Sequence, residues 1–562
     1  MNRLDTYRLD ISTLSPVHIG TGQAYDTTGY VIDGDTLHHF DTAAAMAALP
    51  SADRDKLLAL VSRGGGDALL KDVQRFFHDR RDALMAHATL RLPVLDGVAK
   101  LYESRIGQTA NREDGGRDVI NKLAVERNAF DPVQNQPVLY GSSLKGAMRT
   151  AVLDHFNEHR EAFEHKGLHE FQGRILKYRD QEGRQKLERD PFRLLQIGDA
   201  AWSATDDLPA GEVLFAVNRK RVEVKDPQGN VRPARAENLY QTLECVPAAR
   251  YRAFTAQVAV QDVGGLAAGD KLPAPDRRFG MAELARHCNA FYRPILQREL
   301  ADLAGRDYVD PAWARTVTAL LRGPLGQALE AGRAFLLRVG RHSGAESVTL
   351  NGVRKIRIMQ GQGQPAVEKP EPLTWWLAAS EAGQRTGLLP FGWLLVEVHG
   401  LNEPAPDSPT LREALSSQLD RLRAWTQRRA EEDRRLAELR AQVEARRAEE
   451  AAAAREKAAR DEREKAAAAA RETARAAMTD QQRALDDFRS AFETARAKGA
   501  HQPGSVFDAQ RLAFFKTALG WTEADDRRAA AMLLRETIQW TGWPGKKERK
   551  AEFREWLEQL ER

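Results

Sequence analysis

The clearest helix in this 562-residue chain begins in the sequence Tyr140-Gly141-Ser142-Ser143-Leu144-Lys145-Gly146-Ala147-Met148-Arg149. Apolar residues recur here at the spacing i, i+3, i+4, i+7 and i+8, which places them on one buried helix face: Leu144, Ala147, Met148, Ala151 and Val152. Ser142 or Ser143 is a good candidate for the N-cap, because a serine hydroxyl accepts a hydrogen bond from a free backbone N–H. The segment predicts a half-buried helix with a polar amino end.

The amino end of this helix is also the best candidate binding site in the sequence. Gly141 turns the chain into the helix, whose first free N–H groups attract anions. Lys145 and Arg149 lie one turn apart beside the apolar face, so the serines and these two cations could hold neighbouring phosphates of a nucleic acid. The alternative is a capped surface helix with two solvated cations. The glycine-to-lysine spacing of a P-loop is absent, which excludes that class of NTPase.

Strand patterns occur on both sides of this helix. Residues 7–13 alternate apolar and polar side chains, and the Asp33-Gly34 pair predicts a hairpin within residues 30–40. Helical segments are expected between residues 42 and 90. Further strands are predicted at 213–217, 251–260, 335–339, 347–350 and 394–398. The irregular order of strands and helices predicts an α+β fold rather than a regular βαβ repeat.

Two further loops combine glycines with basic or imidazole side chains. Residues 15–22 follow the first strand and contain His18, Gly20 and Gly22. His18 either hydrogen-bonds RNA or pins the loop in place. Residues 338–347 end a later strand and are typical both of a phosphate-cradling turn and of an ordinary glycine loop. The candidate contacts in this second loop are Arg338, Gly340, Arg341, His342 and Gly344.

Composition changes abruptly after Pro409. No glycine or proline occurs from residue 410 to 498, and alanine is the only apolar residue from 444 to 477. This composition favours a long solvated helix with many ion pairs between successive turns. The predicted organisation is therefore a globular region over 1–405, a long charged Ala/Glu/Arg-rich helical spacer over 410–480 and a small helical domain over 481–562.

Overall composition excludes several classes of protein. The formal net charge is only +4, so a nucleic-acid surface has to come from local clustering of cations. Cys245 and Cys288 lie at no metal-ligand spacing, which argues against a zinc module or a disulfide framework. No apolar stretch is long enough to span a membrane, and we expect a cytoplasmic protein.

The glycine-bearing segments form an ordered series along the chain. It comprises residues 15–22, 140–149, 338–347 and the sequence Leu-Pro-Phe-Gly-Trp at 389–393. The series resembles the RAMP superfamily of CRISPR-associated proteins, and within it the fifth-subunit family of type III-A Csm effector complexes. The segments Asp190–Arg193, Ile197–Asp199 and Glu244–Val246 are also similar to that family. The resemblance covers about residues 5–400, and the tail beyond Pro409 departs from it.

The resemblance implies one or two ferredoxin-like, RRM-related cores with helical insertions, followed here by the charged helix and a small all-α domain. It implies a non-catalytic subunit that binds guide RNA, caps the 3′ end of that RNA and assists its maturation and complex assembly. The residues that would contact RNA are His18, Gly20, Gly22, Gly141, Ser142, Ser143, Lys145, Arg149, Arg338, Gly340, Arg341, His342 and Gly344.

The implied partners are the guide (CRISPR) RNA, a neighbouring RAMP backbone subunit and other effector subunits. Target RNA and host nucleases are further candidate partners. No cofactor, metal ion or membrane partner is expected. Two alternatives stay open at this point. One is a metal-independent endoribonuclease that uses His18, or His342 beside Arg341, as acid and base. The other is a scaffold whose C-terminal domain recruits a partner protein.

Overall fold

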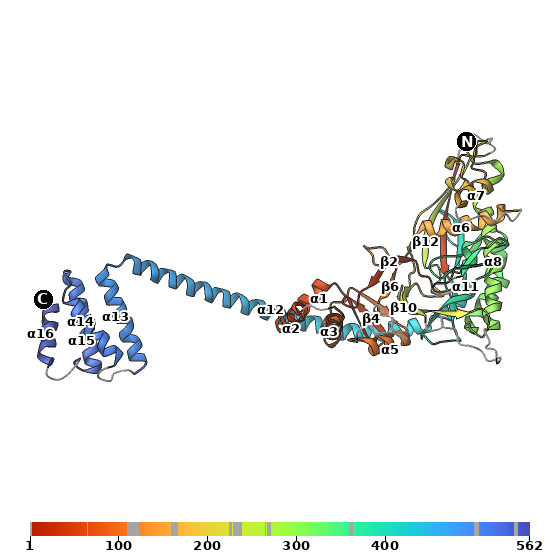
Figure 1. The fold of residues 1–562 in the computed structure, drawn as a ribbon. Helices are drawn as coiled ribbons and strands as arrows, with labels where there is room; N and C mark the ends of the chain where they lie inside the picture. The colour runs from red at the N-terminus through yellow and green to blue at the C-terminus, as the bar shows by residue number, and fades with distance from the viewer. Residues whose placement is uncertain are drawn as a thin grey trace. The chain divides into compact units, whose positions relative to one another are not determined.

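The computed structural model describes residues 3–63, 66–108, 123–158, 167–223, 228, 239–264, 266, 271–358, 363–499, 505–544 and 549–562. Helices and sheets are mixed along the chain (Figure 1), which confirms the predicted combination. The chain divides into two compact units, Met1–Arg447 and Ala448–Arg562. The described helices include none that is both long and apolar enough to cross a bilayer.

A seven-stranded sheet organises one part of the first unit. Its order is β13-β18-β1-β12-β9-β7, with β8 also paired to β12, and every one of these pairings is antiparallel. The strands are β1 (Arg3–Thr13), β7 (Val138–Leu139), β8 (Leu195–Ile197), β9 (Ala200–Trp202), β12 (Phe254–Asp262), β13 (Ala334–Arg338) and β18 (Trp393–Gly400). The strands predicted near residues 7, 251, 335 and 394 are therefore confirmed.

Helices α6 (Gly141–Phe156) and α8 (Met281–Gly305) pack on each other, and both contact β13 of this sheet. All five residues of the predicted apolar face of α6 are buried, which confirms that face. The other helices of this region are α7 (Leu168–Ile175), η2 (Leu187–Arg189), η3 (Pro191–Arg193), η5 (Pro275–Arg277), α9 (Pro311–Arg322) and α10 (Pro324–Glu330).

A six-stranded sheet forms the second layer, in the order β17-β16-β10-β11-β6-β2. Its strands are β2 (Gly20–Tyr25), β6 (Val125–Asn128), β10 (Glu212–Lys220), β11 (Tyr240–Cys245), β16 (Thr374–Ala379) and β17 (Leu389–Pro390). A separate hairpin pairs β14 (Ile356–Ile358) with β15 (Val367–Lys369). β2 is the last strand of the sheet order, so it forms an edge of the sheet.

The predicted strand at 347–350 is wrong. The 3₁₀ helix η6 (Ala345–Val348) occupies this position. Gly344 has a φ of 78°, which turns the chain, and the Ser347 N–H then bonds to the carbonyl of Gly344 at 3.2 Å. Local hydrogen bonds of this kind replace the pairing that a strand would need.

The predicted hairpin around Asp33-Gly34 is confirmed. β3 (Tyr30–Asp33) pairs with β4 (Thr36–His39), and β4 pairs with β5 (Leu90–Pro93). The helices of this region are α1 (Thr42–Ala48), α2 (Ser51–Ser62), α3 (Gly66–Asp79), α4 (Arg81–Met85) and α5 (Asp96–Arg105). Helices α1 to α4 lie within residues 42–90, where the sequence predicted helical segments, whereas α5 lies beyond that range.

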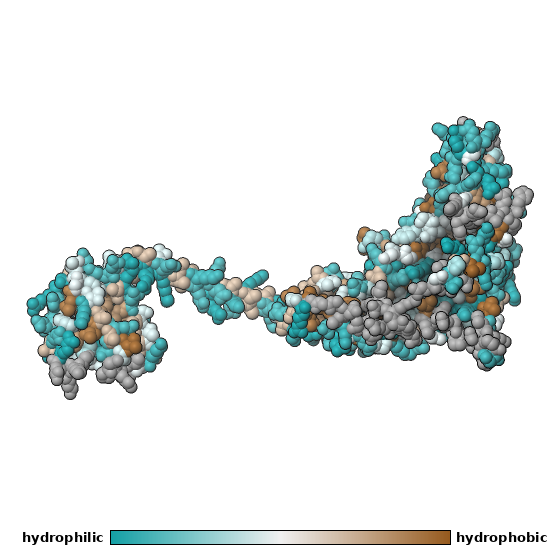
Figure 2. Space-filling model, in the orientation of Figure 1, coloured by the Kyte–Doolittle hydropathy of each residue, from teal (hydrophilic) through white to brown (hydrophobic). Residues whose placement is uncertain are grey.

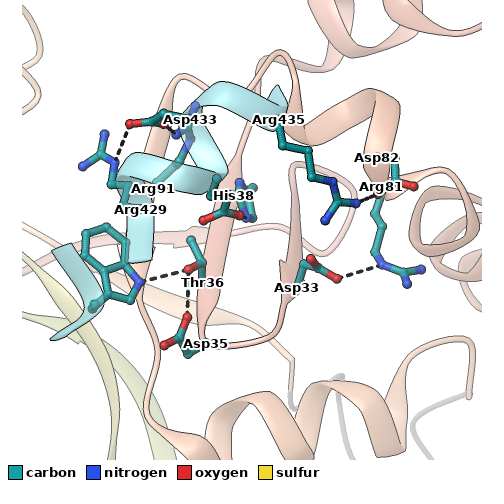
Figure 3. A network of polar contacts seen from close by, with 12 residues as sticks. Asp33, Asp35, Thr36, His38, Arg81, Asp82, Arg91, Arg429, Asp433 and Arg435 are labelled. Carbon is teal, nitrogen blue, oxygen red and sulfur yellow. Dashed lines mark hydrogen bonds and ion pairs between the residues drawn. The ribbon is translucent and has the colours of Figure 1, made fainter. Parts of the chain in front are cut away.

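The long charged helix differs from the predicted spacer in its first part. After α11 (Pro409–Ser416), helix α12 (Asp420–Ala477) starts within the first unit, where Trp425 and Leu436 are buried. Trp425 donates a hydrogen bond to Thr36 at 2.9 Å, and Asp433 pairs with Arg91 (Figure 3). This part of the helix carries large apolar residues that complete the core beside β3 and β4. The division of the chain therefore falls at Arg447 rather than near residue 405.

In the second unit, the part of α12 from Ala448 onward is almost entirely exposed. It is followed by α13 (Asp480–Ala497), α14 (Val506–Ala518), α15 (Ala524–Thr541) and α16 (Lys550–Glu561). These four helices enclose a core of aromatic and aliphatic side chains that includes Phe488, Phe507, Phe514, Phe515, Leu534 and Leu557.

Candidate nucleic-acid interface

The loop after β1 is fixed by a buried histidine. The His18 side chain has no exposed surface, and its Nδ1 lies 2.6 Å from the main-chain oxygen of Glu244 in β11. Because a carbonyl only accepts, Nδ1 carries the proton of this bond. Burial lowers the pKa of His18 below its ordinary value, so the ring stays neutral. His18 therefore pins the loop, which is one of the two roles that the sequence left open.

The loop after β13 packs directly on the first loop. The Arg341 N–H donates to the main-chain oxygen of His18 at 2.8 Å. Gly340 has a φ of 81°, and a Cβ added there would lie within 3.0 Å of the same oxygen. Glycine is required at this position both by the backbone conformation and by the close approach.

The 389–393 segment completes this arrangement. The Gly392 N–H donates to the oxygen of Pro16 at 2.8 Å, and the Trp393 N–H donates to the Ser15 hydroxyl at 2.9 Å. Three of the four segments in the series thus interlock, through residues 15–19, 338–342 and 389–393. These residues are called the loop junction below.

Arg338 is an internal part of the loop junction. Its guanidinium donates to Glu299 of α8 at 2.9 Å and to the main-chain oxygen of Phe391 at 2.9 Å. Glu299 also accepts a hydrogen bond from the Trp393 indole at 2.8 Å. Arg338 and Glu299 are both buried. Arg338 therefore has almost no surface to offer a ligand, although the sequence made it a candidate contact.

Arg341 and His342 lie nearer the surface. The Arg341 side chain is 38% exposed and pairs with Glu126 of β6. His342 bonds to Gln241 at 2.8 Å and stacks on Trp376, with 4.7 Å between the ring centroids. Burial is the main cause that lowers the pKa of His342 to about 3, so this imidazole is also neutral. Gly344, with its φ of 78°, only turns the chain behind them.

The amino end of α6 is capped differently from the prediction. The helix begins at Gly141, and its N-cap residue is Tyr140, whose side chain makes no capping hydrogen bond. The predicted serine N-cap is therefore wrong. Gly141 instead donates its N–H to Asp199 at 2.7 Å. A Cβ at Gly141 would lie 2.8 Å from the carbonyl oxygen of Gly198, which explains the glycine. Ser142 is exposed and Ser143 is half-buried within the first turn.

The two cations of α6 already have protein partners. Lys145 donates to the main-chain oxygen of Leu195 at 2.7 Å, and burial lowers its pKa. Arg149 forms a two-fold contact with Asp190, at 3.1 and 2.8 Å. Both side chains tie α6 to residues 190–195, so they are not the solvated cations of the alternative interpretation.

Sequence reasoning missed Glu244 as a functional candidate. One carboxyl oxygen, Oε2, accepts hydrogen bonds from the Tyr25 hydroxyl at 3.1 Å and the Asn128 N–H at 3.0 Å. Burial raises the pKa of this carboxyl to about 7. The signal in the sequence was a single acidic residue within the apolar end of a strand. No group of three metal-ligating side chains occurs in the described part of the chain.

Residues 10–252 match the model of the RAMP superfamily. Two curated relatives match 28% of the chain: the proteins named CRISPR system Cms protein Csm5 from Mycobacterium tuberculosis strains CDC 1551 / Oshkosh and ATCC 25618 / H37Rv. Each is 28% identical over 173 residues. The chain is therefore similar, over part of its length, to the RAMP superfamily and to Csm5. The match spans only 41% of the length of these relatives.

Two solved structures are also similar to this chain. One is a cryo-EM structure of a Csm–crRNA–target RNA ternary complex in a type III-A CRISPR-Cas system, with a TM-score of 0.43 and 16% identity, covering 70% of this chain and all of that chain. The other is a crystal structure of T. onnurineus Csm5, with a TM-score of 0.38 and 16% identity, covering 69% of this chain and 99% of that chain.

The accessible candidate residues of this chain form two groups. Gly20 and Gly22 are exposed on β2, and Arg341 lies beside them because its partner Glu126 sits on β6, the neighbour of β2. Ser142 is exposed on α6, next to Gly141, which lies close to Gly198 between β8 and β9. Hydrophilic residues predominate on the face of the first unit in Figure 2, with hydrophobic residues in small separate patches.

Proposed function

We propose that this chain is a structural, guide-RNA-binding subunit of a type III-A CRISPR effector complex. It would hold the sugar–phosphate backbone near the 3′ end of the guide RNA and assist maturation and assembly. Its partners would be a neighbouring RAMP subunit, the other effector subunits, target RNA and host nucleases. The observation that carries this proposal is the interlocking of the 15–22 and 338–347 loops beside the exposed glycines of β2. The similarity to Csm5 supports it.

We also propose that the seven-stranded sheet contains a ferredoxin-like core. The strands β18, β1 and β12, followed by β8 and β9, are neighbours in that order, and all adjacent pairs are antiparallel. In chain order these elements follow the scheme β1, α6, β8/β9, β12, α8, β18, which matches the βαββαβ pattern. β13 is then an additional strand at the edge.

The proposed RNA contact is the β2 edge, defined as residues 20–25, together with Arg341. Gly22 has a φ of 78°, and a Cβ there would meet no atom within 4 Å, so a phosphate can approach the backbone closely. Arg341 supplies positive charge beside it. The buried His18, Arg338 and Gly340 would act indirectly, by holding this surface in place. Binding of this kind is mainly electrostatic and weakens as salt rises.

The amino end of α6 would be a second contact, through Ser142 and Ser143. Lys145 and Arg149 would act there as positioning residues. The endoribonuclease alternative has less support, because the ring of His18 is fully buried and the pKa of His342 is lowered to about 3. Neither imidazole offers an exposed acid near neutral pH.

The test is retention of guide RNA by the assembled complex. The full chain is coexpressed with the other effector subunits, and the copurified RNA is quantified and sequenced. Gly22→Asp places a negative charge on the β2 edge, and its matched control is Gly363→Asp, at another glycine with positive φ and open surroundings. We expect loss of RNA, or loss of its 3′ end, only with Gly22→Asp. Equal RNA in both complexes would overturn the proposed contact.

A further inference from the structure

A polar cavity of about 490 Å³ lies in the first unit. None of the candidate RNA contacts lines it, but its lining residue Asn128 pairs with Gly20 and its lining residue Glu244 bonds to His18. It is lined by residues 89–92, 128–130, 134–137, 202, 204, 206–211 and 244–246, with Arg429 of α12. Gln134, Asp206 and Asp207 at its rim are exposed, so the cavity opens to solvent. Its size falls within the range of about 300–1,000 Å³ that is usual for small-molecule sites.

Glu244 brings an unpaired oxygen to this cavity. Its side chain is only 8% exposed, and its Oε2 is occupied by Tyr25 and Asn128. In the part of the chain that the structure describes, no hydrogen bond reaches Oε1. A Cβ added to Gly211, another lining residue, would lie 3.5 Å from Oε1. The absence of a side chain at Gly211 therefore leaves this acceptor open to the cavity.

The other charges at the cavity are largely neutralised by neighbours. Asp206 pairs with the buried Arg250. Arg91 pairs with Asp433, and Arg429 lies 3.6 Å from the same carboxylate (Figure 3). Arg91, Arg250 and Arg429 therefore each have a carboxylate within ion-pair distance, which weakens the attraction of the cavity for a phosphate. This balance favours a neutral polar ligand.

The walls fit a planar ligand with hydrogen-bonding edges. Phe130 and Trp202 contribute aromatic rings, and each has a guanidinium over one face, from Arg127 at 3.8 Å and Arg250 at 4.9 Å. The amide side chains of residues 134–136 also line the cavity, and amides both donate and accept. Proteins recognise unstacked bases with this combination of aromatic surface and polar edge groups.

We propose that this cavity binds a nucleobase, with Glu244 Oε1 accepting a hydrogen bond from an N–H or amino group of the base. The base comes either from an unstacked nucleotide of bound RNA or from a free nucleotide. The first source rests on the proposed function, and the second does not. His18 contributes as a positioning residue, because its ring holds the main chain of Glu244.

The experiment measures binding of AMP, GMP, CMP, UMP and a short single-stranded RNA to the full chain. Gly211→Val fills the cavity beside Oε1, and Glu244→Gln removes the carboxylate while keeping its shape. The matched control is Gly305→Val, where an added Cβ meets no atom within 4 Å. Thermal unfolding checks the fold, and Gly211→Ala replaces the valine variant if that one does not fold.

We expect both cavity variants to weaken binding about 10-fold or more, the usual cost of losing a hydrogen bond to a charged group, and the control to leave it unchanged. Weakened binding of a mononucleotide indicates a free nucleotide as ligand. Weakened binding of the RNA alone indicates an unstacked base. If neither changes, the nucleobase site is overturned, while guide-RNA retention that still depends on Gly22 would leave the proposed function standing.

Discussion

Gly22 and Gly340 have nearly the same backbone conformation, with φ values of 78° and 81°, but contrasting surroundings. A Cβ at Gly340 would press on the main-chain oxygen of His18, whereas a Cβ at Gly22 would meet nothing within 4 Å. The first glycine belongs to the buried loop junction and the second to the exposed β2 edge. A glycine-rich loop thus serves two purposes here: close packing of the protein on itself, and an open backbone that a ligand can approach.

Arg338 and Arg341 show the same contrast between a buried and an exposed residue. Their substitution gives the largest expected difference in the free energy of unfolding. Arg338→Met leaves Glu299 buried without its cation, which should lower the free energy of unfolding by about 3–5 kcal/mol. Arg341→Ala removes only a half-exposed ion pair and should cost less than about 1 kcal/mol. Urea unfolding of the two variants measures the difference. Similar losses would show that Arg338 is not part of a buried pair.

The two glycines themselves provide the next test. Gly340→Ala combines an unfavourable backbone conformation with a clash against a main-chain atom, and we expect a cost of about 3 kcal/mol or more. Gly22→Ala meets only the conformational penalty, about 1 kcal/mol. Thermal unfolding monitored by circular dichroism compares them. Equal destabilisation by the two substitutions would contradict the distinction between the packed loop junction and the open β2 edge.

Much of this fold was predictable because its signals are local. The apolar spacing of α6, the alternation in β1 and the Asp33-Gly34 turn each depend on residues close together in the chain. The partners of the cations are not local: Arg149 meets Asp190, 41 residues away, and Arg338 meets Glu299, 39 residues away. The sequence therefore identified the basic residues, but it did not identify the acidic residues that form ion pairs with them.

The helix α12 and Glu244 illustrate two other limits. Trp425 and Leu436 are diluted among charged residues, so the composition of the whole segment predicted a solvated helix, while the structure buries both side chains. Glu244 lies between Leu243 and Cys245 at the end of β11, and this apolar setting alone did not identify its carboxyl as one that lines a cavity. Its cavity also depends on Gly211 and on residues 128–130 and 134–137, which only the fold brings together.

Glu244 connects the two compared regions, because His18 of the loop junction holds its carbonyl and Tyr25 of the β2 edge holds its carboxyl. Its pKa is raised from 4.5 to about 7, so between these values the folded state binds a proton that the unfolded state releases. Stability should therefore fall as pH rises from 4.5 to 7, by roughly 3 kcal/mol in total. Glu244→Gln should abolish this contribution.

The measurement is urea unfolding of the wild type and Glu244→Gln at several pH values. The pKa values of His18 and His342 are lowered, so these residues act in the opposite direction, adding stability as pH rises towards 6.5. Both proteins share that effect, and the difference between them isolates the carboxyl. A difference that does not change between pH 4.5 and 7 would place the pKa of Glu244 near its ordinary value.

The smallest expected effect is on RNA binding by the exposed β2 edge and Arg341. Arg341→Ala should weaken binding of single-stranded RNA only a few-fold, because one cation neutralises one phosphate. The dependence of log K on log salt should become shallower by about 0.7, the amount for one phosphate on a single strand. Arg184→Ala, an exposed arginine paired with Asp180, is the matched control and should change neither quantity. An unchanged salt dependence for Arg341→Ala would remove the phosphate contact from the β2 edge, even with the loop junction intact, because a buried scaffold alone does not bind RNA.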